Sequence, residues 1–204
     1  MSDVENILQF YFMSNKLKNT LRTGWKYWSV EGVRVESIAE HIYGTLMLAV
    51  SICAHTTLEI DIERVALMLA LHETEEILIG DITIYDGERY ETKKEQGHKA
   101  VCALFNDSKK DLFLEVIDEF EKGETKEAKF AYMCDKLEAD LQAFLYKDHF
   151  NLENANKTCL ENGDILAMID KGFRRPDQFF LQNDKEKFEG IFRKIADYLQ
   201  ELED

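Results

Sequence analysis

Apolar residues recur at helical spacing along most of the chain. Ile7, Leu8, Tyr11 and Phe12 fall three and four positions apart, which predicts a helix over 4–21. The same periodicity predicts helices over about 91–106, 110–120 and 125–146, and an amphipathic helix over 185–202 that packs on the body of the protein. The aromatic, glycine-containing segment 22–28 is expected to form an ordered loop.

Two further helices carry N-terminal capping signals. Ser37 and Glu40 fit a capping box, in which each side chain bonds the free backbone N–H of the other residue, so a helix is expected to begin near Ser37. Asp61 can cap a helix from Ile62 to about Ile79, which Gly80 is placed to end. This last helix is apolar nearly all round, which predicts that it is buried.

Turn residues are too scarce for an all-β fold. The 204 residues include one proline and ten glycines, and 45% are apolar. A sandwich of strands needs turn residues at intervals of about 8 to 12 positions. Since no repeat, low-complexity tract or proline-rich linker divides the chain, we expect one all-α domain over 1–204, large enough to bury its own core.

The charge balance excludes large anionic partners. Twenty-five lysines and arginines stand against 40 aspartates and glutamates, a net charge of −15. Binding a nucleic acid polymer requires clustered basic side chains, which are absent from the sequence, whereas a small phosphate ester can still bind where a metal screens the charge. The longest apolar run, 65–71, is far shorter than the roughly 20 residues of a membrane span, and no signal-peptide pattern opens the chain. We therefore expect a cytoplasmic protein without a membrane partner.

Titratable residues occur on helix faces that should be buried. His41 shares a face with Ile38 and Thr45, and His72 lies on the apolar stripe of the helix predicted from Ile62. In that helix Glu73 and Glu76 fall on the same arc as His72, within about 100° of it. A lone inward histidine is more often hydrogen-bonded in a core, and a glutamate run is usually solvated, but a buried charge must be paired or bind a metal.

A further carboxylate comes from the helix predicted over 125–146. Asp135 lies off its exposed face, with Ala131 and Ala139 one turn to either side, which leaves room for a larger group to approach. Two imidazoles and two carboxylates from buried helices form a mixed nitrogen and oxygen set that suits a divalent transition metal. Asp81, just after Gly80, is an unfavourable charge at a helix C-terminus and has either a functional role or that of a loop cap.

The aromatic loop offers candidates for ligand binding. Trp25 follows Gly24 and lies near Arg22, so it is the better candidate to stack on a base, whereas Trp28 is expected to fill space between helices. Arg22 could bind a ligand or cap a helix end.

Taken in order, these segments resemble the HD-domain phosphohydrolases and, more narrowly, their 5'-deoxynucleotidase subgroup. The resemblance covers about residues 18–148, followed by an extension over 149–204, and implies an HD-domain helical bundle. It rests on an ordered set of short motifs, none of them specific alone: RTGW at 22–25, ESIAEH at 36–41, LHETEE at 71–76, GDIT at 80–83, EAKF at 127–130 and CDKLE at 134–138.

The resemblance implies a role for each candidate. His41, His72, Glu73 and Asp135 would bind one divalent metal ion, for which Mn, Co, Fe, Ni and Zn are the transition-metal options and Mg is a further one. Glu76 would be the catalytic acid or base, Asp81 would hold the sugar hydroxyl, Arg22 and Trp25 would meet the phosphate and the base, and Thr83 would lie near the nucleotide.

Position 73 departs from the family, which has aspartate there. Glu73 is one methylene longer, which displaces its carboxylate by about 1.5 Å. Metal sites tolerate distance errors of only about 0.2 Å, so the backbone or the side-chain rotamer must compensate. Glutamate is still an oxygen ligand, and we expect metal binding to be retained.

The implied activity is hydrolysis of 5'-nucleoside monophosphates, in particular deoxyribonucleotides, by a homodimer. Three alternatives stay open. One is a hydrolase of the same superfamily that acts on another nucleotide phosphoester. The second, motivated by Glu73, is a metal- or nucleotide-binding protein without turnover. The third is a plain helical scaffold, which would bind no metal and lose little stability on addition of a chelator.

Overall fold

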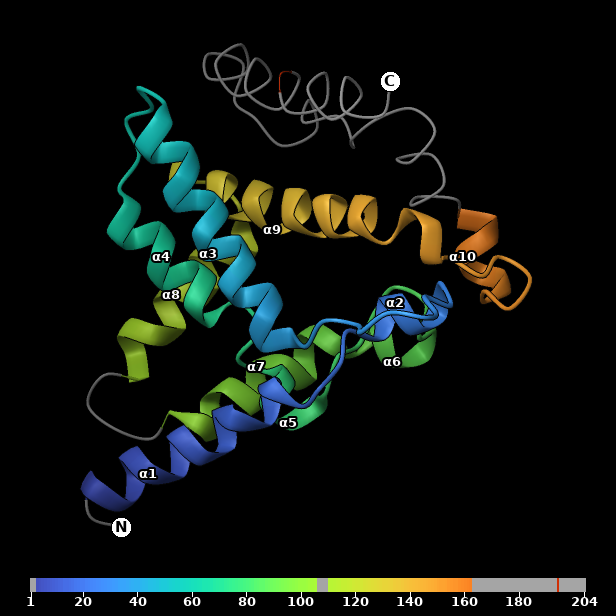
Figure 1. The fold of residues 1–204 in the computed structure, drawn as a ribbon. Helices are drawn as coiled ribbons and strands as arrows, with labels where there is room; N and C mark the ends of the chain where they lie inside the picture. Colours follow the sequence, from blue (N-terminus) through green and yellow to red (C-terminus); the bar gives the residue numbers. More distant parts are fainter. Residues whose placement is uncertain (1–2, 106–109, 163–193, 195–204) are drawn as a thin grey trace.

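The computed structural model describes residues 3–105, 110–162 and 194 (Figure 1). Helices make up its regular structure, and no strand occurs in these ranges beyond two isolated bridges, Leu21 with Ser37 and Val30 with Phe150. The elements are, in order, α1 (Asp3–Ser14), η1 (Asn15–Lys18), α2 (Thr23–Tyr27), α3 (Ile38–His55), α4 (Ile62–Leu71), α5 (Glu76–Ile79), α6 (Glu88–Glu91), α7 (Lys93–Leu104), α8 (Lys110–Lys122), α9 (Lys126–Leu145), η2 (Lys147–His149) and α10 (Lys157–Asn162). The all-α prediction is confirmed.

Helices α3, α4, α8 and α9 pack together as the central bundle. Helix α9 crosses α3 in Figure 1 and also packs against α4, and α8 lies against α4 and α9. The side chains at their interfaces are apolar and fully buried, as the sequence pattern predicts: Val65, Met68 and Leu69 of α4, Val116 of α8, and Phe130, Ala131 and Cys134 of α9. Each large side chain of this kind contributes about 1.5–3 kcal/mol by leaving water, so the bundle is a rigid base for polar groups placed between its helices.

By length and composition, α3 could cross a membrane; in the part of the chain that the structure describes, no other helix could. It packs against α4 and α9, and the residues that it buries are Ile38, His41, Thr45, Ala49 and Ile52.

The three capping predictions are confirmed. Ser37 Oγ accepts the Glu40 N–H and Glu40 Oε2 accepts the Ser37 N–H, at 3.3 and 2.8 Å, which fixes the first turn of α3. Asp61 accepts the N–H groups of Glu63 and Arg64 at the start of α4. Gly80 ends α5 with φ +75°, a conformation that favours glycine.

The N-terminal segment differs from the predicted helix over 4–21. Helix α1 ends at Ser14 and continues as the short 3-10 helix η1. Ser14 Oγ donates to the Phe10 carbonyl and the Asn15 side chain to the Tyr11 carbonyl, at 2.9 and 2.7 Å, so side chains bond carbonyls that would otherwise accept backbone N–H groups. The predicted loop over 22–28 also contains a helix, the five-residue α2, which is too short for its periodicity to be visible.

The prediction of one continuous helix from Ile62 to Ile79 is wrong. The α4 helix ends at Leu71, and a tight turn leads into α5. In this turn the N–H groups of Thr74, Glu76 and Ile77 bond the carbonyl three residues earlier, at 2.9, 3.2 and 3.3 Å, which is 3-10 geometry. The turn redirects the polar residues of the segment, so their angles on an ideal helix do not apply.

The remaining predictions hold with shifted ends. The helix predicted over 91–106 becomes α6 and α7, whose junction is Thr92, while α8 and α9 match 110–120 and 125–146 closely, with Thr125 capping α9. The helix predicted over 185–202 lies outside the described residues. So does most of the extension over 149–204, and its division from a core over 18–148 stays a prediction.

Candidate metal centre

Two histidines reach the centre of the bundle from different helices. His41 lies in the first turn of α3, just beyond the capping box, and is 0% exposed. His72 caps the C-terminal end of α4, and its Nδ1 bonds the Leu69 carbonyl at 2.8 Å. That bond places the proton on Nδ1 and leaves Nε2 as an acceptor directed at the neighbouring carboxylates.

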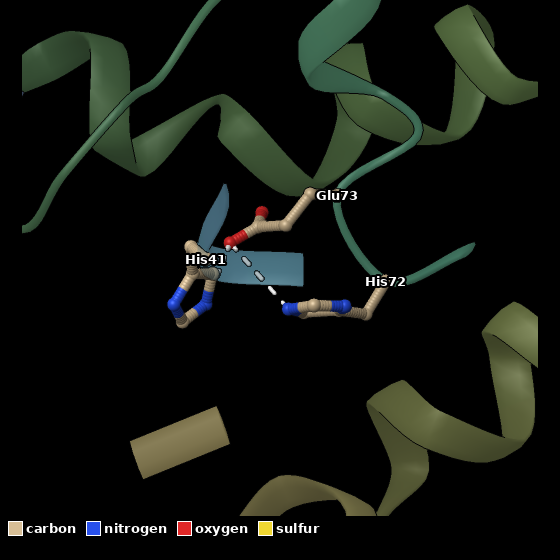
Figure 2. A group of neighbouring side chains, drawn as sticks. All are labelled: His41, His72 and Glu73. Atoms are coloured by element: carbon tan, nitrogen blue, oxygen red, sulfur yellow. Dashed lines mark ion pairs between the residues drawn. The ribbon is translucent and has the colours of Figure 1, made fainter. Parts of the chain in front are cut away.

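Two carboxylates lie beside these imidazoles. Glu73 Oε1 is 3.8 Å from His41 Nε2 and 3.7 Å from His72 Nε2, and Figure 2 shows this oxygen between the two rings. Asp135 Oδ1, from α9, is 3.1 Å from His41 Nε2 and 4.0 Å from His72 Nε2. The four residues predicted as ligands therefore converge, and the turn after α4 carries the longer Glu73 side chain into the group.

The donor atoms fit a divalent cation. His72 Nε2 is buried and has no hydrogen-bond partner among the described residues, although a buried polar atom normally has one. It belongs to a compact set of histidine and carboxylate ligand atoms, in which those of His41, His72 and Glu73 lie within 4.8 Å of one another. Nitrogen and oxygen donors of this kind suit a transition metal, so a cation among them would satisfy the imidazole that the protein leaves unpaired.

The charges in the group are set by its burial and its neighbours. Burial opposes ionisation of Glu73, but its electrostatic interactions with His72 and Arg22 outweigh burial and lower the pKa of Glu73 to about 2. Burial lowers the pKa of His72 and also opposes the charge on His41, where hydrogen bonds to Asp135 and Glu138 prevail and raise the pKa to about 9. The carboxylates are thus ionised at neutral pH, as metal ligands must be, and a cation at His41 Nε2 would displace a proton.

Glu76 lies beside this group at the start of α5. It is 2% exposed, its Oε1 accepts a bond from Lys93 Nζ at 2.9 Å, and its Oε2 is buried without a hydrogen-bond partner in the described part of the chain. Burial, together with the charges of Glu73 and Asp81, raises the pKa of Glu76 well above its ordinary value of 4.5. This carboxyl group can therefore hold a proton under conditions in which an exposed glutamate cannot.

A cavity of about 750 Å³ opens onto these residues. Its lining includes Glu73, Glu76 and Asp135, and all four residues predicted to bind substrate: Arg22, Trp25, Asp81 and Thr83. A pocket of this size is in the range that holds a small-molecule ligand.

The substrate candidates have partners within the protein. Arg22 donates to Glu73 Oε1 at 2.9 Å, so its guanidinium lies next to the proposed ligands. Trp25 is only 4% exposed and donates its indole N–H to Glu36 at 2.8 Å, which makes it a fixed wall of the cavity. Asp81 accepts the Thr23 N–H.

Thr83 lies in the loop that follows α5. Its hydroxyl donates to Asp86 at 2.9 Å, and Asp86 also accepts a bond from the Tyr27 hydroxyl at 2.7 Å. These hydrogen bonds connect the loop to α2. Thr83 therefore lines the cavity from a loop that is held in place.

Three further residues of the site were not identified from the sequence. Glu138 contacts His41 Nδ1, Lys93 contacts Glu76, and Lys136 lies 2.8 Å from Asp135 Oδ2. Glu138 follows Asp135 by one helical turn, so its place on the same face was a usable signal. Lys93 comes from α7, and nothing in its local sequence indicates which carboxylate it meets.

Comparisons with known proteins agree with this architecture. The chain is 31% identical to human 5'-deoxynucleotidase HDDC2 over 147 residues, 70% of this chain and 69% of that protein. It is 31% identical to 5'-deoxynucleotidase HDDC2 of Dictyostelium discoideum over 163 residues, 76% of this chain and 85% of that protein.

Solved structures share the fold at lower sequence identity. A conserved hypothetical protein from Pyrococcus furiosus has a TM-score of 0.66 at 22% identity. The match covers 95% of this chain and 99% of that protein's chain. A protein described as a predicted metal-dependent phosphohydrolase from Magnetospirillum magnetotacticum has a TM-score of 0.63 at 23% identity, covering 98% of this chain and 95% of its own. The family model for the HD domain matches residues 14–169, more than half of the sequence. The chain therefore belongs to the HD domain family.

Proposed function

We propose that the chain is a metal-dependent phosphohydrolase that removes phosphate from 5'-deoxynucleoside monophosphates. The observation that carries the proposal is the unpartnered, buried His72 Nε2 within a group of four ligand residues, at a cavity that also holds Arg22 and Asp81. The activity named for the HDDC2 relatives supports the choice of substrate.

His41, His72, Glu73 and Asp135 would hold the metal. A divalent cation there supplies Lewis acidity toward a phosphate oxygen and makes water nucleophilic near neutral pH. The mixed donor set admits Mn, Co, Fe, Ni or Zn, with Mg as a further option. The cation would also offset the repulsion between a phosphate and a protein of net charge −15.

Glu76 would transfer the proton. Attack of water forms the new phosphorus–oxygen bond, and the ester bond to the 5' oxygen breaks with its electron pair remaining on that oxygen. A proton removed from the attacking water must reach the leaving oxygen to give a nucleoside and inorganic phosphate. The raised pKa of Glu76 suits it to accept and return a proton, and Lys93 fixes the carboxyl group by holding Oε1.

The other cavity residues would orient the nucleotide. Arg22 can donate to phosphate oxygens, and the Asp81 carboxylate can accept a bond from a sugar hydroxyl. Trp25 would contact the base, and Thr83 lies on a loop that also lines the cavity.

Phosphate release from a panel of ribo- and deoxyribonucleoside monophosphates tests the proposal. The purified protein, supplied with each metal in turn, should favour 5'-deoxynucleotides. The variant Glu76→Gln should lower kcat by about 10²- to 10⁴-fold, while Glu63→Gln, at an exposed position of α4, serves as the matched control. Turnover of Glu76→Gln near the wild-type rate would remove Glu76 from the mechanism. Activity confined to cyclic or polyphosphorylated nucleotides would instead support the alternative hydrolase.

We also propose that the protein is a cytoplasmic homodimer. Helix α1 exposes Val4, Ile7, Leu8, Tyr11 and Phe12 by 46–66%, an apolar face of the kind that a subunit interface covers. Light scattering should give twice the mass of the 23.8 kDa chain. A mass of one chain at micromolar concentration would contradict the dimer.

A further inference from the structure

The two nitrogen atoms of His41 have different partners. Nε2 is the atom that faces Asp135 and Glu73, at 3.1 and 3.8 Å. Nδ1, on the opposite side of the ring, is hydrogen-bonded to Glu138 Oε2 of α9. His41 is 0% exposed and Glu138 is 8% exposed, so water does not compete for this bond.

The bond to Glu138 decides how His41 can act as a ligand. A neutral imidazole carries one proton, and a carboxylate acceptor at Nδ1 holds that proton there. Nε2 is then the atom with a free electron pair, and the ring is fixed with that pair directed at the centre of the group. A carboxylate in this place also makes the imidazole a more basic ligand.

The backbone of α3 makes room for Glu138 at Gly44. This residue is one helical turn after His41 and therefore lies on the same face of α3. A Cβ atom added at Gly44 would lie 2.5 Å from Glu138 Oε1 and 3.0 Å from both Cδ and Cγ of that side chain. With any residue other than glycine at this position, the Glu138 side chain would have to shift from the place it occupies beside His41.

The position of Glu138 is electrostatically unfavourable. A ligand atom of a second buried carboxylate, Glu36, lies within 4.8 Å of those of His41 and Glu138, and Glu36 is itself held by the Trp25 indole N–H at 2.8 Å. Two buried carboxylates side by side repel each other, and an apolar residue would fill the space without that repulsion. A carboxylate at this position is explained if His41 needs it as a hydrogen-bond partner.

We infer that Glu138 is the positioning residue that fixes His41 as a metal ligand, and that Gly44 is required because it admits this carboxylate. The inference rests on the proposed metal site and adds to it two residues that do not touch the metal. Outer partners of this kind contribute about 10- to 100-fold to metal affinity.

The test measures binding of Mn²⁺ alone, and of Co²⁺ alone, by chelator competition in the absence of substrate. Glu138→Ala should weaken binding by about 10- to 100-fold, and Glu138→Gln, whose amide oxygen still accepts from Nδ1, should lose less. Gly44→Ala should also weaken binding, although it removes no polar group. Glu63→Ala is the control for removing a glutamate, and circular dichroism checks that each variant is folded.

The double variant Gly44→Ala with Glu138→Ala separates the inference from a general packing defect. If Gly44 acts through Glu138, the second substitution adds no further loss of affinity once Glu138 is gone. A merely structural Glu138 would change the unfolding temperature and leave metal affinity at the wild-type value, which would overturn the inference while the metal site stands. Failure of the wild-type protein to bind either metal would overturn the proposed function itself.

Discussion

Replacing Glu73 with aspartate tests how this chain accommodates its departure from the family pattern. Glu73→Asp restores the residue type of the family and keeps the charge, but shortens the side chain by one methylene. If the turn between α4 and α5 is built for glutamate, the shorter residue should bind metal less tightly than the wild type, even though it matches the family.

The size of the effect follows from the distances. Glu73 Oε1 now lies 3.7 and 3.8 Å from the two Nε2 atoms and 2.9 Å from Arg22. Aspartate withdraws the carboxylate by about 1.5 Å, whereas ligand distances tolerate errors of only about 0.2 Å. The backbone is tied by hydrogen bonds from Thr74 N to Leu71 O and from Glu76 N to Glu73 O, at 2.9 and 3.2 Å, so it cannot readily follow. Losing a direct ligand should reduce metal affinity by more than the roughly 10- to 100-fold that loss of an outer partner costs.

The assay is titration of the metal-free protein with Mn²⁺ by chelator competition. Glu63→Asp, the same change at an exposed position of α4, is the matched control and should bind Mn²⁺ like the wild type. If Glu73→Asp bound Mn²⁺ as tightly as the wild type or more tightly, this would refute the argument that aspartate is too short to reach the metal. If Glu73→Asp gained phosphatase activity that the wild type lacks, the wild-type chain would be a binding protein without turnover.

Three further predictions concern stability. Ser37→Ala removes the capping box of α3 and should lower the free energy of unfolding by about 1 kcal/mol in urea denaturation; an unchanged midpoint would contradict the role of the cap. Burial opposes ionisation of Glu119, but bonds from Thr125 and Arg64 outweigh it and hold its pKa below the ordinary 4.5, so the ionised group stabilises the fold above that pH and loses its effect as the pH falls through the folded-state pKa. The cost of Glu119→Gln should therefore be largest near neutral pH and shrink below 4.5, and a cost independent of pH would exclude this linkage. Adding Mn²⁺ at 100 times its Kd should raise Tm by about 5–10 °C, a shift that a chelator reverses; identical melting curves would mean that the folded state binds no metal.

The helices of the bundle could be predicted because they are stabilised by amphipathic faces and capping residues, and both are visible in the local sequence. Ser37 and Asp61 begin their helices as their side chains suggest. The break after Leu71 was not predictable in this way, because the residues of the turn are as compatible with a continuing helix as with 3-10 geometry. That choice depends on tertiary contacts, among them the bond between Glu73 and Arg22.

The candidate ligands could be predicted because a charge on a buried face needs an explanation, and the order of the motifs supplied one. The structure brings His41, His72, Glu73 and Asp135 together, but their role as ligands stays a prediction. Their supporting partners were harder to find. Pairing of Lys93 with Glu76 depends on the path of the loop between α5 and α7, which one sequence does not specify.

The central claim is most directly tested by counting divalent metal ions per chain in the purified protein by elemental analysis, after reconstitution and gel filtration. The wild-type protein should retain one equivalent, and His72→Ala, which removes the unpartnered imidazole, should retain far less. A wild-type protein without bound metal, or a His72→Ala variant that retains the same equivalent, would contradict the claim that these side chains hold a cation.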